Sequence, residues 1–153
     1  MRIVPFEVQY LPDFISLNEA WMNELFGEVE ETDKKAFEDA ERIVREGGQI
    51  FFALNDEGKA IACCMTRPLQ EGEWEICKFA AMGMGTGKGA GAQCLAACIG
   101  YAEAMGALKL CVASHTKCEK AVHLYQKFGF CVVPYSFEKF GLKRCNISLE
   151  LKI

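Results

Sequence analysis

The stretch "GMGTGKGAGAQCL", from Gly83 to Leu95, has the clearest chemical potential in this sequence. It places five glycines within nine residues and then continues as an apolar pattern of helical period. Backbone N–H groups at the start of a helix lack an intrahelical acceptor, and the helix dipole adds partial positive charge there. Because glycine has no Cβ, a large anion can approach those N–H groups closely. The stretch therefore predicts a phosphate-binding loop at the N-terminus of a helix.

Two common phosphate-binding patterns match this loop poorly. A P-loop requires Gly-x-x-x-x-Gly-Lys-Ser/Thr, but Met82 occupies the first position and Gly89 replaces the hydroxyl that would hold magnesium. A Rossmann fingerprint is met loosely by Gly87, Gly89 and Ala92. The strand that follows ends in "CVASH" and lacks the acidic residue that would bind a ribose hydroxyl. Dinucleotide binding is therefore only a minor alternative.

Two segments, in the expected order and at the expected distance, resemble the GNAT superfamily of N-acetyltransferases. The first, "EICKFAAMGMGTGKGAGAQCL", is similar to the acetyl-CoA loop of that family, Gln/Arg-x-x-Gly-x-Gly/Ala, with Thr86 where Gln or Arg is usual. The second, "CEKAVHLYQKFGF" (118–130), is similar to the family segment Asn-x-x-Ala-x-x-x-Tyr-x-Lys-x-Gly-Phe, with Cys118 in place of Asn. The phosphate-binding donors are main-chain groups, so these two changes leave them in place.

The resemblance implies an α/β protein with one GNAT-like domain over residues 1–153, which uses acetyl-CoA as co-substrate and no metal. The pantetheine arm would lie along the strand before the loop and bind main-chain groups of Phe79, Ala80 and Ala81, as an added strand does. An N–H group there would also stabilise an oxyanion. The residues implied to bind the rest of the cofactor are Thr86, Gly87, Lys88, Gly89, Ala90, Gly91 and Ala92.

Acetyl transfer to an amine needs a neutral amine, a stabilised oxyanion and a proton for the departing thiolate. Glu75 stands where many GNAT enzymes carry a glutamate that acts as a base through water, although it could instead be a solvated strand residue. Glu73, His115 and water are the alternative bases. The resemblance places the hydroxyl of Tyr125 near the CoA sulfur, where it would protonate the thiolate. The alternative for Tyr125 is packing in the core beside its apolar helix neighbours.

The implied reaction is N-acetylation of a primary amine on a small molecule, amino acid or peptide. A non-catalytic acyl-CoA sensor is the rival function, since it would keep the loop without turnover. In the resembling fold the first two helices and their connection wall the acceptor site, so acids there would favour a cationic amine. The simpler interpretation, which we favour, is a set of solvated charges, with Asp33 or Thr32 capping the second helix. These acids are Glu28, Glu30, Glu31 and Asp33.

Hydrophobic periodicity predicts the elements that would position these residues. Helices are expected over 11–26, from Ala36 to Gly47, from Ala90 to Gly106, and over 121–128. Strands are expected at "MRIVPFEV", at "QIFFAL" and "AIACCMT" joined as a hairpin, at 73–81, and at "LKLCVAS", "FCVV" and "CNISLEL". The predicted order is β-α-α-β-β-β-α-β-α-β-β, a mixed α/β domain with one central sheet.

Composition excludes several other classes of protein. A length of 153 residues fits one domain, and a net charge of −4 without a basic stripe argues against nucleic-acid binding. No apolar run approaches the ~20 residues that span a bilayer, and the N-terminus lacks the apolar region of a secretory signal. The nine cysteines lie in apolar segments without a Cys-x-x-Cys pair, so we expect buried thiols in a reducing cytoplasm. The sequence is compatible with a homodimer.

Overall fold

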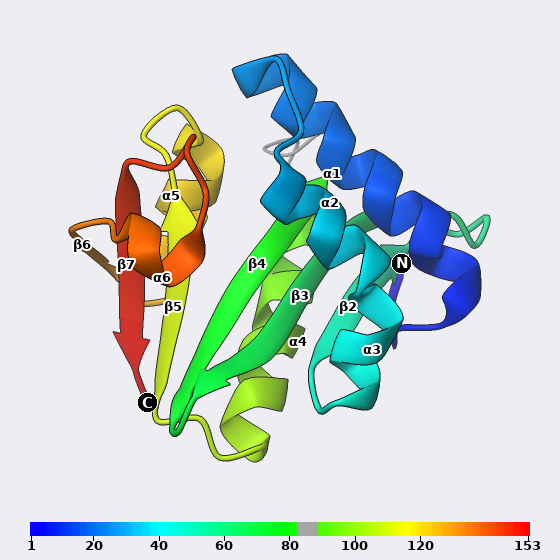
Figure 1. Cartoon of the computed structure of the whole chain (residues 1–153). Coiled ribbons are helices and arrows are strands. Elements are labelled where there is room, and N and C mark those ends of the chain that lie inside the picture. The colour runs from blue at the N-terminus through cyan, green and yellow to red at the C-terminus, as the bar shows by residue number, and fades with distance from the viewer. Residues whose placement is uncertain (83–88) are drawn as a thin grey trace.

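The computed structural model describes residues 1–82 and 89–153 and shows helices packed on both faces of a mixed sheet (Figure 1). The first half of the chain contains β1 (Arg2–Pro5), the 3-10 turn η1 (Val8–Tyr10), α1 (Leu11–Phe26), α2 (Glu31–Glu38), α3 (Ala40–Arg45), β2 (Gln49–Leu54), β3 (Ala60–Gln70) and β4 (Glu73–Ala81). The second half contains α4 (Ala90–Ala104), β5 (Lys109–Ser114), α5 (Glu119–Lys127), β6 (Cys131–Val133), α6 (Phe137–Phe140) and β7 (Ile147–Lys152). Within the described residues, seven strands form one sheet in the order β1-β2-β3-β4-β5-β7-β6.

The predicted helix over 11–26 is confirmed, because local signals define both of its ends. Pro12 lies in the first turn, where its missing N–H costs nothing, and Gly27 ends the helix with a φ of 76°. The predicted second helix is instead two helices, α2 and α3, which meet at Asp39. The Asp39 carboxylate pairs with Arg42 at 2.8 Å, and short acidic side chains of this kind favour helix ends over helix interiors.

Two hydrophobic clusters lie on opposite faces of the sheet, α4 on one face and α1, α2 and α3 on the other (Figure 1). On the α4 face, Leu95 packs with Ile76 of β4. On the α1 face, Phe14 packs edge-on against Phe37 and Phe52. Strand β4 contributes to both clusters, so its side chains alternate between the two layers.

The strands β4 and β5 diverge along their length, and this divergence positions the site. They pair in parallel only from Glu73 with Lys109 to Glu75 with Cys111, among the described residues. Beyond that point β4 continues beside β3, while β5 continues beside β7, and Figure 1 shows the two strands separating. A bulge lies in β4, where the register with β3 shifts and Lys78 has a φ of 50°. Such bulges bend a strand and increase its twist.

Some details differ from the sequence-based expectation. The first strand is shorter than "MRIVPFEV", and the one-turn helix α6 was not predicted, since four residues are too few to show a helical period. All nine cysteines are free thiols, but only five of them are buried: Cys63, Cys64, Cys94, Cys98 and Cys111. Of the described helices, none is long and apolar enough to cross a membrane.

Candidate active site

A cavity of about 470 Å³ occupies the space between the diverging strands. One wall is the stretch of β4 from Glu75 to Ala81, and the opposite wall includes Ala113 and Ser114 of β5. The start of α5 and the C-terminal end of α1 complete the lining. The parallel pairing stops at the residue where this cavity begins, so the divergence of the strands creates the space.

The N-terminus of α4 lies next to this wall and presents main-chain donors. Gly89 precedes the helix with a φ of 74°, a conformation that glycine adopts without strain. The first intrahelical bond runs from the N–H of Gln93 to the carbonyl of Gly89 at 3.0 Å, so the N–H groups of Ala90, Gly91 and Ala92 have no intrahelical acceptor. A Cβ on Gly91 would lie 3.0 Å from the Phe79 ring, which explains glycine at that position.

Three of the loop residues predicted to bind the cofactor, Thr86, Gly87 and Lys88, lie outside the described residues. The strand residues Phe79, Ala80 and Ala81 all line the cavity. Ala80 and Ala81 pair with β3 on one edge of β4, and the other edge has no strand partner beyond Glu75 among the described strands. A polar edge of this kind can accept an extended ligand as an added strand.

Tyr125 projects from α5 into the same cavity. It is buried, and its ring contacts Phe79 and Phe130 at centroid distances of 5.9 and 5.8 Å. Burial raises the pKa of the Tyr125 phenol well above its ordinary value, so the hydroxyl keeps its proton. No hydrogen bond links this hydroxyl to another described residue. The geometry combines core packing of the ring with a protonated hydroxyl at the cavity.

Of the alternative bases, Glu75 is the buried carboxylate that lines the cavity. Its Oε1 accepts a hydrogen bond from Nε of Arg67 at 3.0 Å. Glu73 does not line the cavity, and its carboxylate pairs with Lys109 at 3.0 Å and Lys139 at 2.9 Å. Burial acts to raise the pKa of Glu73, but the hydrogen bonds from Lys139 and Lys109 outweigh it and lower the pKa. Glu73 therefore holds two cations rather than facing a ligand.

His115 lines the cavity from the loop after β5, but its ring nitrogen is already engaged. Its Nδ1 accepts a hydrogen bond from the N–H of Lys117 at 2.9 Å. A neutral imidazole that accepts at Nδ1 carries its proton on Nε2 and has no second lone pair to accept another. The ring packs edge-on against Phe26 at 5.4 Å, so the visible contacts of His115 are structural.

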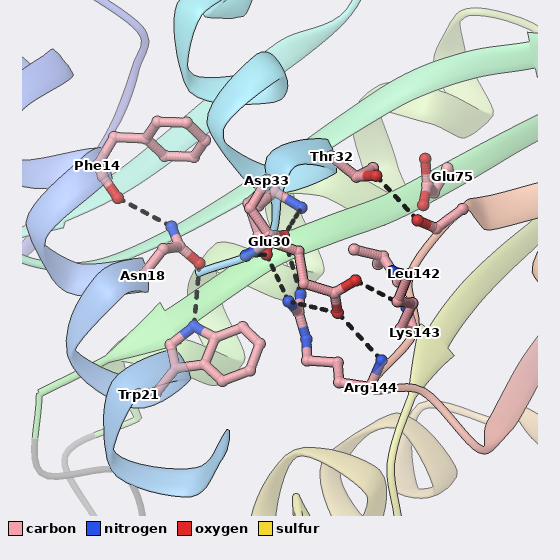
Figure 2. Close-up of polar contacts among 12 residues, drawn as sticks. Phe14, Asn18, Trp21, Glu30, Thr32, Asp33, Glu75, Leu142, Lys143 and Arg144 are labelled. Atoms are coloured by element: carbon pink, nitrogen blue, oxygen red, sulfur yellow. Dashed lines mark hydrogen bonds and ion pairs between the residues drawn. The ribbon is translucent and has the colours of Figure 1, made fainter. Parts of the chain in front are cut away.

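A buried ion network that the sequence patterns did not reveal lies beside the cavity (Figure 2). The side chain of Asp33 is fully buried and accepts hydrogen bonds from Nζ of Lys78 at 2.9 Å and from Nη2 of Arg144 at 2.9 Å. Arg144 also donates from Nη1 to the second oxygen of the same carboxylate, so this contact is bidentate. Burial acts to raise the pKa of Asp33, but the hydrogen bond from Arg144 and the charge of Lys78 outweigh it and lower the pKa.

Glu30, a second acid of the α1–α2 connection, has structural partners too. The Glu30 carboxylate accepts hydrogen bonds from the N–H groups of Lys143 and Arg144 at 2.8 and 3.0 Å (Figure 2). Glu30 also caps α2, in a capping box with Asp33, while Thr32 donates to the carbonyl of Gly141 instead of capping. Among the described residues that line the cavity, none is an acid of this connection. The alternative of an acidic wall for a cationic amine is therefore not supported, and the favoured interpretation is corrected at Asp33, which takes part in capping α2 but is a buried rather than a solvated charge.

Aromatic rings hold the Arg144 guanidinium from the side of α1. The guanidinium carbon lies 5.1 Å from the centre of the Trp21 ring and 5.9 Å from that of Phe26. Nζ of Lys117 lies 5.5 Å from the Phe26 ring. Cation–π contacts of this kind fix the orientation of a guanidinium. Trp21, Phe26 and Arg144 all line the cavity, so this end of it combines aromatic surface with positive charge.

Three half-buried thiols also line the cavity: Cys77, Cys118 and Cys145. Burial raises the pKa of Cys77 to about 12 and that of Cys145 to about 11, and it raises the pKa of Cys118 as well. Among the described residues, no group of three or more His, Cys, Asp or Glu side chains is arranged to hold a metal ion.

Comparison with known proteins places these features in a wider context. The model of the acetyltransferase (GNAT) family matches residues 14–130. An acetyltransferase of the GNAT family from Staphylococcus aureus has a similar structure, with 16% identity over 99% of this chain and 98% of its own, at a TM-score of 0.88. An acetyltransferase from Streptococcus agalactiae shows 14% identity over 99% and 98%, at a TM-score of 0.84. PaiA N-acetyltransferase from Thermoplasma acidophilum, in complex with coenzyme A, shows 17% identity over both entire chains, at a TM-score of 0.75. No curated protein matches the sequence.

Proposed function

The chain belongs to the GNAT family of acetyltransferases, and on that premise we propose that it acetylates the primary amine of a small molecule, amino acid or peptide. Family membership makes it an enzyme that transfers an acyl group from coenzyme A. The dinucleotide alternative loses its support, because the family match includes the part of the glycine-rich segment on which it rested. The cytoplasmic location and a homodimer stay predictions from the sequence.

One observation carries the proposal: the free edge of β4, Glu75 and Tyr125 line one cavity, and the N-terminus of α4 lies next to its β4 wall. The free edge suits the pantetheine arm, through main-chain groups of Phe79 to Ala81. The first-turn N–H groups of α4 suit the pyrophosphate. The loop residues Thr86, Gly87 and Lys88 are proposed to extend that phosphate site. A sensor that only binds acyl-CoA would not need a buried carboxylate and a protonated phenol in the same cavity.

In the proposed reaction, the neutral amine attacks the thioester carbonyl directly, and the new C–N bond forms as the carbonyl oxygen becomes an oxyanion. A main-chain N–H of the β4 edge stabilises that oxyanion. The tetrahedral intermediate then collapses, the C–S bond breaks, and the thiolate takes a proton from the hydroxyl of Tyr125. Glu75, directly or through water, takes the proton that the amine nitrogen loses. Release of the proton from Glu75 to solvent and return of a proton from solvent to Tyr125 complete the cycle.

The first experiment is a thiol-release assay with acetyl-CoA and a panel of primary amines, with mass spectrometry of the products. We expect thiol release that depends on the amine, together with a mass increase of the amine by one acetyl group. Calorimetry with acetyl-CoA alone supplies the control. Tight binding without thiol release across a broad panel would contradict transfer and favour an acyl-CoA sensor, whereas failure to bind acetyl-CoA would contradict the assignment of the cavity.

A further inference from the structure

We propose that Lys78 and Arg144 form a carboxylate-binding subsite, so that the acceptor is an amino acid or another small amine that carries a carboxylate. This inference rests on the proposed acetyl transfer and names the substrate class of the same cavity. It differs from the alternative raised by the acids of the α1–α2 connection, which was recognition of a cationic amine.

The first support is the arrangement of charges around the cavity. Lys78 and Arg144 line the cavity, whereas their counter-ions Asp33 and Glu30 are absent from its lining among the described residues. The acids therefore lie behind the cations, and an entering ligand meets the positive groups first. Of the acids that do line the cavity, Glu75 is paired with Arg67, and two are exposed to solvent. These two are Glu24 and Glu119.

The second support is that both cations keep hydrogen-bond donors without partners among the described residues. The side chain of Lys78 is only 5% exposed, and its ammonium group uses one of three donors, on Asp33. The side chain of Arg144 is 8% exposed, and two of the five N–H donors of its guanidinium, one on Nη1 and one on Nη2, are used on Asp33. Nη1 also lies 3.6 Å from the Glu30 carboxylate, so the Nε–H and the second Nη2–H have no hydrogen-bond partner among the described residues. Buried charged donors gain stabilisation from a charged acceptor.

The third support is the position of Lys78 next to the expected reaction centre. Residues of a regular strand alternate between faces, so Lys78 would point away from Glu75 and Cys77 toward α4. The bulge at φ 50° instead turns it to the face of α2, where it reaches Asp33. In the sequence, Lys78 directly precedes Phe79, Ala80 and Ala81, whose main-chain edge is proposed to bind the pantetheine arm. A carboxylate held there keeps an α-amine within the same cavity as Glu75.

The aromatic residues complete a subsite for an amino acid. Trp21 and Phe26 fix the Arg144 guanidinium by their rings and line the cavity beside it. Their ring surface suits an apolar side chain, because burial of apolar area is favourable. An amine without a carboxylate would make no use of the cavity-facing donors of Lys78 and Arg144, and a doubly cationic amine would be repelled by these two cations.

The test compares matched acceptors on the wild-type protein by thiol release. Phenylalanine and leucine are each paired with the amine that lacks the carboxylate, phenethylamine and isoamylamine, and with the neutral amino-acid amide. We expect kcat/KM to be roughly 10- to 100-fold higher for the acids, the usual range for charge-assisted hydrogen bonds. Calorimetry of the same compounds with the CoA-bound protein measures the subsite without turnover, so it still tests the subsite if acetyl transfer itself fails.

The matched variants are Lys78→Met and Lys34→Met, the latter an exposed lysine of α2 whose ion pair with Glu31 is at the surface. Lys78→Met leaves Arg144 paired with Asp33, and we expect it to remove most of the preference for the acid over its matched amine. Lys34→Met should keep the preference. Acetyl-CoA affinity and thermal unfolding identify a variant that has not folded, in which case the wild-type comparison decides.

Two outcomes would overturn the proposal. One is a kcat/KM for phenethylamine and isoamylamine equal to or above that of the acids. The other is an unchanged preference in folded Lys78→Met, which would move carboxylate recognition elsewhere. Neither outcome affects the proposed acetyl transfer, whereas absence of thiol release from every amine, with amino acids still binding to the CoA-bound protein, would refute the transfer and leave the subsite.

Discussion

The two walls of the cavity are built from different chemistry. The proposed cofactor wall, formed by Phe79 to Ala81 with the first turn of α4 beside it, offers main-chain groups and side chains that are small or turned into the core. The proposed acceptor wall, formed by Lys78, Arg144, Trp21 and Phe26, offers charged and aromatic side chains held by a buried ion network. The first wall depends on backbone conformation, and the second depends on side-chain identity.

This difference explains why the two walls tolerate change differently. Main-chain N–H groups stay in place when a side chain varies, so Thr86 and Cys118 can replace the residues usual in the family without removing the cofactor wall. The acceptor wall has no such protection, because a single substitution at Lys78 or Arg144 removes a charge and leaves Asp33 with one partner fewer. Changes on the first wall should therefore act on cofactor binding and chemistry, and changes on the second on acceptor choice and stability.

The largest effect is expected on the chemistry beside the cofactor wall. Tyr125→Phe keeps the ring between Phe79 and Phe130 but removes the proton donor, so turnover should fall by roughly 10²–10⁴ while acetyl-CoA affinity changes little. Single-turnover rates measured beside steady-state rates separate the chemical step from product release. Rates within about threefold of wild type would make Tyr125 a packing residue and assign the proton to water or another group.

The next largest effect is expected on stability, in the acceptor wall. Asp33→Asn keeps a cap for α2 but leaves the buried Lys78 and Arg144 without their shared charge, so the free energy of unfolding should fall by roughly 3–5 kcal/mol. Urea unfolding of both proteins measures this difference.

The same substitution should show a defined dependence on pH. The pKa of Asp33 is lower in the folded than in the unfolded protein. The stabilisation that ionised Asp33 gives to the folded state is therefore complete at a pH above its unfolded-state pKa, and it is lost as the pH falls through its folded-state pKa. The stability difference between the two proteins should stay constant from pH 7 to about 5 and narrow only at more acid pH. A difference that narrows already above pH 5 would show that Asp33 does not carry the effect.

A smaller loss of activity is expected from the carboxylate proposed as the base. Glu75→Gln should lower turnover by about 10²-fold, since the amide cannot take a proton from the amine. Glu73→Gln is the matched control, because it makes the same change two residues away, outside the cavity lining. It should lower stability through the loss of two ion pairs and keep turnover near that of wild type. Equal losses of turnover in both variants would assign the effect to the strand and not to a base.

The last effect is expected on cofactor binding, from charge at the start of α4. Gly89→Asp should weaken acetyl-CoA binding by roughly 10²-fold, because a carboxylate near the pyrophosphate is repelled. Gly89→Asn is the control, since Asn has the same size and tolerates the φ of 74° equally well. A Cβ here would meet only Gln93 Nε2 at 3.8 Å, so both variants should fold. Equal affinities of the two variants in calorimetry would show that no phosphate lies at this helix start.

Much of the fold and of the cofactor wall could be predicted from the sequence, because these features have local signals. The bounds of α1 follow from its apolar spacing, its early proline and the glycine after it. The hairpin of β2 and β3 follows from the turn residues between two apolar runs. The placement of Phe79 to Ala81, Glu75 and Tyr125 around one cavity followed from the resemblance of two ordered motifs.

The acceptor wall could not be predicted, because it depends on long-range contacts and on one irregular residue. Arg144 meets Asp33 across 111 positions of the chain, and neither residue belongs to a motif. Regular alternation along β4 assigns Lys78 to the wrong face, and only the bulge corrects this. The acids of the α1–α2 connection were visible in the sequence, but their partners were not, so they were interpreted as solvated charges rather than as members of a buried ion network.

The three thiols that line the cavity have a consequence for the fidelity of acyl transfer. A cysteine beside an acetyl thioester could capture the acetyl group by transthioesterification, and the thiolate is the form that attacks. Burial holds the pKa of Cys77 at about 12 and that of Cys145 at about 11, so at neutral pH both are almost entirely uncharged thiols. Desolvation therefore keeps Cys77 and Cys145 in the unreactive thiol form, which would leave the acetyl group to the amine acceptor proposed above.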